Sequence, residues 1–123
     1  MPSTTTCSAG PSTRSASWIP LLYPNHPNHP EYPGAHGCWT TAVTETMAAF
    51  FGTDKVAFSM QSTVAAVEQK TRCYERFSDA AKEVYDARTW AGIHFRNSSL
   101  EGAWIGRKVT RYIVANFLRP TKA

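Results

Sequence analysis

Cysteine, long apolar runs and clustered charge are all scarce in this sequence. Its three cysteines in 123 residues are widely spaced and odd in number, which excludes a disulfide framework or a zinc knuckle. No run of apolar residues approaches the roughly 18 that a membrane helix needs, and the stretch Met1–Ser17 lacks the apolar segment of a secretory signal. We therefore expect a soluble chain, and its sequence indicates no compartment.

Positive charge is in slight excess over negative charge. Lys and Arg number 13 against nine Asp and Glu, which gives a formal net charge of +4. The basic residues are scattered, and no run of them reaches three. This pattern excludes the basic stripe that is typical of nucleic-acid-binding proteins, so no nucleic-acid partner is expected.

Composition divides the chain into a tail and a domain. Ser and Thr make up nine of the 17 residues of Met1–Ser17, and such a segment buries too little apolar surface to offset its chain entropy. The next stretch, Pro20–Pro33, holds most of the prolines and the repeat Pro24-Asn25-His26-Pro27-Asn28-His29-Pro30, which is typical of an extended path. We predict a disordered Ser/Thr/Pro-rich tail over residues 1–23 and a partial domain over residues 24–120.

Apolar residues at helical spacing predict three helices, over His36–Phe51, Asp79–Ala91 and Ser99–Leu118. Between the first two helices, the sequence predicts a loop with a short strand or a helical turn. Cys38 is expected in the core, and Trp90 and Trp104 are expected in the core or in former contacts between helices. Three helices around such a loop indicate an all-α fold.

Serines and glycines mark the helix ends and one close contact. Ser78 is the predicted N-cap of the second helix, and Ser98 or Ser99 is that of the third. Gly102 and Gly106 lie one turn apart in the third helix, so another backbone can approach them closely.

Two of the four histidines stand in settings that suit chemistry. His36 begins the first predicted helix, whose first N–H groups have no partner within the helix and favour an anion. Arg88 precedes His94 by six residues, and Gly92 between them can turn the chain as the second helix ends. A guanidinium and an imidazole are then directed toward one centre, which predicts an anion site.

Two segments resemble motifs of a known family. Pro30-Glu31-Tyr32-Pro33-Gly34-Ala35-His36 resembles the second motif, P-S-G-H, of the vanadium-dependent haloperoxidase and type 2 phosphatidic acid phosphatase superfamily. Ala87-Arg88-Thr89-Trp90-Ala91-Gly92-Ile93-His94-Phe95-Arg96 resembles the third, S-R-x-x-x-G-x-H. From about His29 to Pro120 the chain is similar to the haloperoxidase-like branch, including its plant members. The resemblance implies a partial helical bundle that corresponds to the C-terminal part of that fold.

The resemblance also implies a role for each residue of the site. His94 would attack phosphorus in a phosphatase or bond vanadium in a peroxidase, and His36 would be the general acid or base. Arg88 would hold oxyanion oxygens, and the N–H groups around Gly34 and Ala35 would add donors. The implied ligand is a small oxyanion or a phosphate ester, with vanadate as the cofactor.

This sequence departs from the family pattern in two motifs. The serine of the second motif is Gly34 here and its glycine is Ala35, so one hydroxyl donor is lost. The first motif, K-x6-R-P, supplies two further positive charges and is absent, because no lysine is followed seven residues later by an arginine. The resemblance therefore implies a truncated, weakly active or inactive chain, whose helices expose faces that other helices normally cover.

Other functions also fit these residues. His26, His29 and His36 suggest a metal-binding segment, although an extended path places the first two about 9 Å apart. A non-catalytic remnant would bind phosphate-like anions or associate with other helical chains through its exposed helix faces. The sequence leaves open whether the parent activity is halide oxidation or phosphate ester hydrolysis, and it does not give the oligomeric state.

Overall fold

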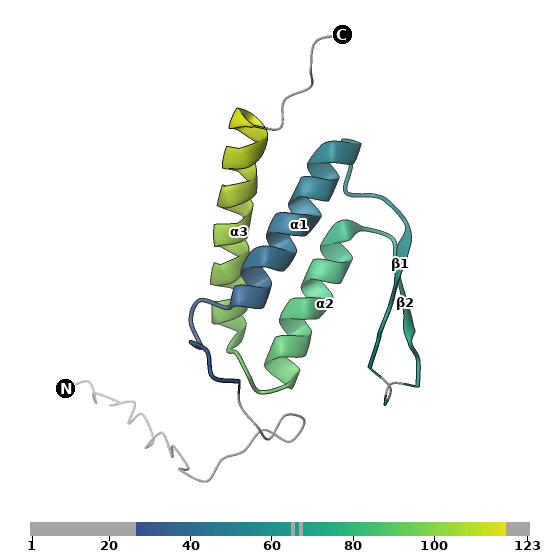
Figure 1. Ribbon diagram of the computed structural model, residues 1–123, viewed down its shortest axis with the longest axis vertical. Coiled ribbons are helices and arrows are strands. Elements are labelled where there is room, and N and C mark those ends of the chain that lie inside the picture. Colours follow the sequence, from purple (N-terminus) through teal and green to yellow (C-terminus); the bar gives the residue numbers. More distant parts are fainter. Residues whose placement is uncertain (1–26, 65, 67, 118–123) are drawn as a thin grey trace, which may run out of the picture.

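The computed structural model describes residues 27–64, 66 and 68–117 of the chain. The predicted tail over residues 1–23 lies outside them. The described elements are α1 (Ala35–Phe51), β1 (Phe58–Gln61), β2 (Thr71–Tyr74), α2 (Phe77–Trp90) and α3 (Arg96–Asn116). In Figure 1, α1 lies between α2 and α3, and the two strands stand beside α2 on the side away from α3. Three helices are therefore confirmed close to their predicted bounds.

The fold is mostly helical, as predicted, but it is not purely all-α, because β1 and β2 form an antiparallel hairpin. Phe58 faces Tyr74 across the two strands, and their rings stack with centroids 5.2 Å apart. Phe58 also packs on Phe77, the first residue of α2, at 5.4 Å. A cross-strand aromatic pair of this kind stabilises a short hairpin, and here it also attaches the hairpin to the helices.

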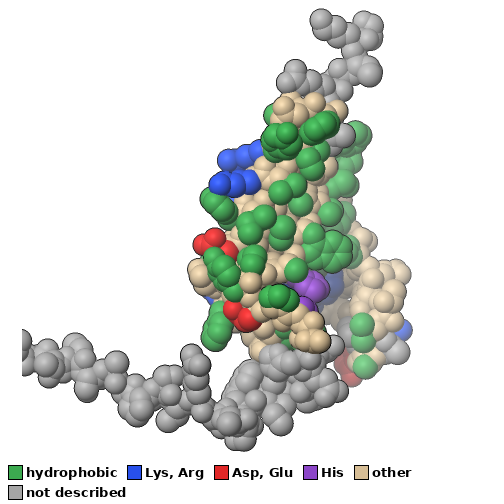
Figure 2. Space-filling model, turned by 60° about the vertical axis from the view of Figure 1, so that its left-hand side comes forward, with side chains coloured by type: hydrophobic (Ala, Val, Ile, Leu, Met, Phe, Trp, Pro, Cys, Tyr) green, Lys and Arg blue, Asp and Glu red, His purple; other side chains and the backbone are tan. Residues whose placement is uncertain are grey.

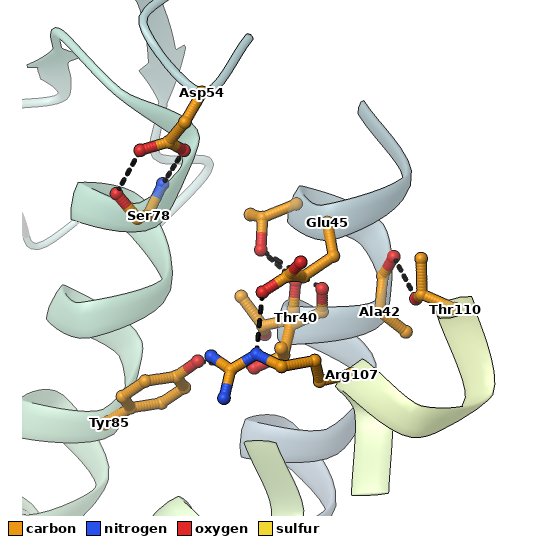
Figure 3. A network of polar contacts seen from close by, with 10 residues as sticks. Thr40, Ala42, Glu45, Asp54, Ser78, Tyr85, Arg107 and Thr110 are labelled. Atoms are coloured by element: carbon orange, nitrogen blue, oxygen red, sulfur yellow. Dashed lines mark hydrogen bonds and ion pairs between the residues drawn. The ribbon is translucent and has the colours of Figure 1, made fainter. Parts of the chain in front are cut away.

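The sequence predicted Ser78 as the N-cap of α2, but a distant carboxylate caps this helix instead. The helix begins one residue before Ser78, after an N-cap at Arg76 that provides no side-chain hydrogen bond. The Ser78 N–H donates to Asp54 Oδ1 at 2.9 Å, and the Ser78 hydroxyl donates to Asp54 Oδ2 at 2.6 Å (Figure 3). Asp54, in the loop after α1, thus accepts hydrogen bonds from donors at this helix end that have no partner within the helix.

The N-terminus of α3 is capped in the same way, by Glu31. The N-cap position is Phe95, so the prediction of a cap at Ser98 or Ser99 is also wrong. The Phe95 N–H donates to Glu31 Oε1 at 2.9 Å, and the Ser98 hydroxyl donates to the same oxygen. These donors, the Ser98 hydroxyl first and the Phe95 N–H second, hold the pKa of Glu31 below its usual value.

Helices α1 and α3 pack through their smallest residues. A Cβ built on Gly102 would overlap the Gly34 carbonyl oxygen, and one built on Gly106 would overlap that of Cys38. The expectation that these two glycines admit another backbone is confirmed. Polar contacts also join α1 to its neighbours. Thr110 donates to the Ala42 carbonyl at 3.1 Å, and Arg107 pairs with Glu45 at 2.8 Å (Figure 3). Thr41 of α1 is hydrogen-bonded to Tyr85 of α2.

Large apolar side chains lie mostly outside this interface. The buried apolar residues are few: Phe77, Ala80, Ala81, Ile93 and Ala103. The exposed ones on α1 and α3 include Trp39, Val43, Met47, Phe50, Leu100, Trp104, Ile113 and Phe117. Trp90 and Trp104 are both exposed, because close backbone packing buries the small-residue faces. Of the two places that the sequence suggested for them, the core is excluded, and former contacts between helices stay an expectation. Figure 2 shows hydrophobic side chains along one face of the molecule, with histidines near its lower end. No described helix has the length and apolar character to cross a membrane.

Candidate functional site

The candidate site lies where the C-terminal end of α2 approaches the N-terminal end of α1. Arg88 is in the last turn of α2, and Gly92 then turns the chain with a φ of 68°. The N–H groups of Ile93 and His94 both donate to the Arg88 carbonyl oxygen, at 3.2 and 3.3 Å. The turn after α2 therefore ties the backbone of His94 to that of Arg88, as the Gly92 pattern had suggested.

The His94 ring is fully buried and held in one orientation. Its Nδ1 lies 2.6 Å from the Glu31 carbonyl oxygen, which can only accept a hydrogen bond, so Nδ1 carries the proton. In the neutral ring the lone pair is then on Nε2, which is buried and has no hydrogen-bond partner among the described residues. A buried, oriented lone pair is what a nucleophile or a metal ligand requires.

His36 is the second residue of α1 and lies within electrostatic reach of the other site residues. Burial lowers the pKa of His36, and the positive charge of Arg88 lowers it further, as would a proton added to His94 or His29. Its Nδ1 is buried without a hydrogen-bond partner in the described part of the chain. The ring is therefore neutral at pH 7, in a setting with an excess of positive charge.

His29 is a site residue that sequence reasoning assigned only to a metal-binding segment. Its ring stacks on that of His94, with centroids 5.3 Å apart and 19° between the planes, and its Nε2 lies 3.5 Å from Arg88 Nη2. Among the described residues, no group of three or more His, Cys, Asp or Glu side chains is placed to hold a metal ion. His26, which the metal hypothesis also needs, lies outside them.

Gly34 and Ala35 differ in what they offer to an anion. The Gly34 N–H donates to the Ser98 carbonyl oxygen at 2.8 Å, so the expectation that it serves an anion is not met. Ala35 is the first residue of α1, where N–H groups have no partner within the helix. A Cβ on Gly34 would lie 3.0 Å from the Ser98 oxygen and 3.1 Å from the Ser99 Cα, so little space exists for the family serine.

Glu31 and Ser99 also border the site, although the spacing of the sequence did not indicate them as site residues. Glu31 lies inside the quoted motif segment, and its carbonyl orients His94. Ser99 was considered only as a helix cap. Its hydroxyl is buried without a hydrogen-bond partner among the described residues, next to Gly34.

The chemical types of these side chains suit a small oxyanion. His94 Nε2 could offer a lone pair to a central phosphorus or vanadium atom, and a guanidinium such as that of Arg88 suits the surrounding oxygens. His36 adds a neutral imidazole nitrogen that can exchange a proton. The two further positive charges of the family's first motif have no counterpart at the expected spacing in these 123 residues.

Comparison with protein families and comparison with solved structures both give matches. The family model described as VCPO second helical-bundle domain matches residues 6–122. A solved structure described as the first bacterial vanadium-dependent iodoperoxidase has 29% sequence identity and a TM-score of 0.68, over 80% of this chain and 23% of that one. The chain thus spans less than a quarter of that relative's length. Comparison with curated proteins gave no match.

Proposed function

The chain belongs to the vanadium haloperoxidase-like family through its second helical-bundle domain, and on that premise we propose that it binds a small oxyanion at His36, Arg88 and His94. The ligand is vanadate or phosphate. The observation that carries the proposal is the buried Nε2 of His94, whose lone pair is fixed by the Nδ1–H bond to the Glu31 carbonyl. A core histidine with no chemical task normally satisfies both ring nitrogens.

Each residue has a separate task in this proposal. His94 Nε2 bonds the central atom, and Arg88 donates hydrogen bonds to the anion's oxygens while offsetting their charge. His36 is neutral at pH 7 because its pKa is lowered. The negative charge of a bound anion opposes that shift, so His36 takes up a proton more readily once the anion is present.

Of the two parent activities that the sequence left open, halide oxidation is the one that the comparisons favour for a complete site of this kind. Vanadate, when bound, would supply an electrophilic centre that activates an oxidant such as hydrogen peroxide. The solved relative is a vanadium-dependent iodoperoxidase, which supports this branch over phosphate ester hydrolysis. In either case the residues of this chain bind and orient the anion and move one proton.

Arg88→Ala should weaken phosphate or vanadate binding at least about tenfold, because a hydrogen bond to a charged group contributes roughly 1.5–3 kcal/mol. His94→Ala should have an effect of similar size on vanadate. Isothermal titration calorimetry with phosphate and ⁵¹V NMR with vanadate measure these changes.

The matched control is Arg96→Ala, two residues beyond His94. Arg96 Nη2 pairs with Asp86 at 3.0 Å and its side chain is 64% exposed, so its removal should leave anion binding within about twofold. If the Arg88 and Arg96 variants lose equal anion affinity, binding depends only on the net charge of the protein, and the proposed site is wrong.

We also propose that the exposed apolar faces of α1 and α3 pack against another helical chain, which in a purified sample is a second copy. Four large apolar residues lie along one face of α1 at helical spacing: Trp39, Val43, Met47 and Phe50. Exposed apolar residues also lie on α3, and hydrophobic side chains run along one face of the molecule (Figure 2). Such an apolar patch is typical of an interface.

Val43→Glu should therefore reduce self-association at least about tenfold, because a carboxylate in an apolar interface is left without a partner. Sedimentation velocity over a range of protein concentrations measures the change. Met60→Glu is the control: Met60 lies on β1 and is 56% exposed, nearly the same as Val43 at 55%. A wild-type protein that is monomeric at every concentration would contradict the proposal.

A further inference from the structure

We propose that the Glu31 carboxylate is a positioning residue for His94: it anchors Glu31 to the N-terminus of α3, so that the carbonyl of the same residue fixes the proton of His94 on Nδ1. This inference rests on the oxyanion site proposed above. It concerns the side chain of Glu31, which the motif pattern of the family does not use.

Glu31 contacts α3 and His94 with different atoms. Its carboxylate accepts the Phe95 N–H at 2.9 Å and the Ser98 hydroxyl, both at the start of α3. Its backbone carbonyl accepts the His94 Nδ1–H at 2.6 Å. The side chain therefore fixes the position of the residue, and the backbone of that residue orients the imidazole.

The charge of Glu31 favours the same tautomer. Its Oε1 lies 3.7 Å from His94 Nδ1, and a negative charge near that nitrogen stabilises the proton there. His94 Nε2 then keeps its lone pair for the anion. Without the carboxylate, both the anchoring bonds and this electrostatic preference are weakened, and the proton can move to Nε2, where it would block the bond to vanadium or phosphorus.

Asp54 provides an internal comparison. It caps α2 with the same chemistry, because its carboxylate accepts the Ser78 N–H at 2.9 Å and the Ser78 hydroxyl at 2.6 Å. Asp54 contacts the first turn of α2, whereas Arg88 lies in the last turn of that helix. Changing each carboxylate to its amide therefore weakens one helix cap in both cases, but touches the site only at Glu31.

The experiment compares Glu31→Gln with Asp54→Asn in the full chain. The ring ¹⁵N shifts of His94, from long-range ¹H–¹⁵N NMR without any anion, report which nitrogen carries the proton. We expect the wild type and Asp54→Asn to show one Nδ1–H tautomer, and Glu31→Gln to show a mixture. Phosphate binding should weaken about threefold to tenfold in Glu31→Gln only, while both variants lose thermal stability to a similar extent.

The outcomes separate this inference from the site on which it rests. A wild type that binds no phosphate, with a tautomer mixture only in Glu31→Gln, would refute the site and retain the positioning role. Phosphate binding with an unchanged His94 tautomer in Glu31→Gln would overturn the positioning role and retain the site. A tautomer change of equal size in Asp54→Asn would also overturn it, because loss of a helix cap alone would then be the cause. If Glu31→Gln does not fold, Glu31→Asp takes its place: it keeps the charge but its shorter side chain weakens the anchoring bonds, so a smaller change in the same direction is expected, and an unchanged tautomer and affinity would overturn the anchoring role.

Discussion

Gly102→Ala should lower the free energy of unfolding by about 2–3 kcal/mol. The added methyl group would overlap the Gly34 carbonyl oxygen, and its other near neighbours are also α1 backbone atoms. Because backbone cannot rotate away as a side chain can, α1 and α3 must separate. Urea denaturation followed by circular dichroism measures the change.

The sign of this effect tests how the helices pack. Helix propensity alone predicts that Gly102→Ala stabilises the protein by about 1 kcal/mol, since alanine is the better helix former. Gly52→Ala is the control, because Gly52 has a φ of 70° and no atom within 4 Å of the added methyl group. It should cost about 1 kcal/mol from backbone strain alone. A stabilised Gly102→Ala variant would show that α1 and α3 do not pack through their backbones.

The helices could be predicted from the sequence because their periodicity is local, but the capping residues could not. Ser78, Ser98 and Ser99 are good caps by residue type, yet the donors of α2 and α3 are served by Asp54 and Glu31, which lie 24 and more than 60 residues away. A cap supplied by a tertiary contact leaves no signal in the spacing of neighbouring residues. The same applies to the hairpin, whose Phe58–Tyr74 pair joins two short segments.

The packed face of α1 also could not be predicted from the sequence, for a related reason. Large apolar residues at helical spacing on α1, such as Val43 and Met47, are exposed. The packed face instead carries Gly37 and Thr41. Hydrophobicity scales give such residues little weight, although the close approach that they permit decides the interface.

Motif order placed His36, Arg88 and His94 together, and the structure brings them within electrostatic reach of one another. Spacing could not show which His94 nitrogen carries the lone pair, because that depends on the Glu31 carbonyl, 63 residues earlier in the chain. It also could not show the stacking of His29 on His94. Both contacts come from the segment just before α1, and they become visible only when the fold brings it against the end of α2.

The 123-residue chain should bind vanadate at least about a hundredfold more weakly than the bacterial iodoperoxidase, and should show no measurable oxidation of iodide or bromide. The family's first motif would add a lysine and an arginine, and this sequence has no such pair at that spacing. Each charged hydrogen-bond partner contributes roughly 1.5–3 kcal/mol in a shielded site, so losing two removes about 3–6 kcal/mol of binding free energy. ⁵¹V NMR gives the affinity, and a halide oxidation assay with vanadate and peroxide gives the turnover.

Turnover that is abolished by His94→Ala would contradict this prediction and would require another source of positive charge. The nearest candidates in the sequence, Arg96 and Arg107, are each paired with a carboxylate, Asp86 at 3.0 Å and Glu45 at 2.8 Å. Either arginine would have to leave its partner to reach the anion. Asp86→Asn and Glu45→Gln release these side chains one at a time, so an active chain should become more active in the variant that frees the compensating arginine.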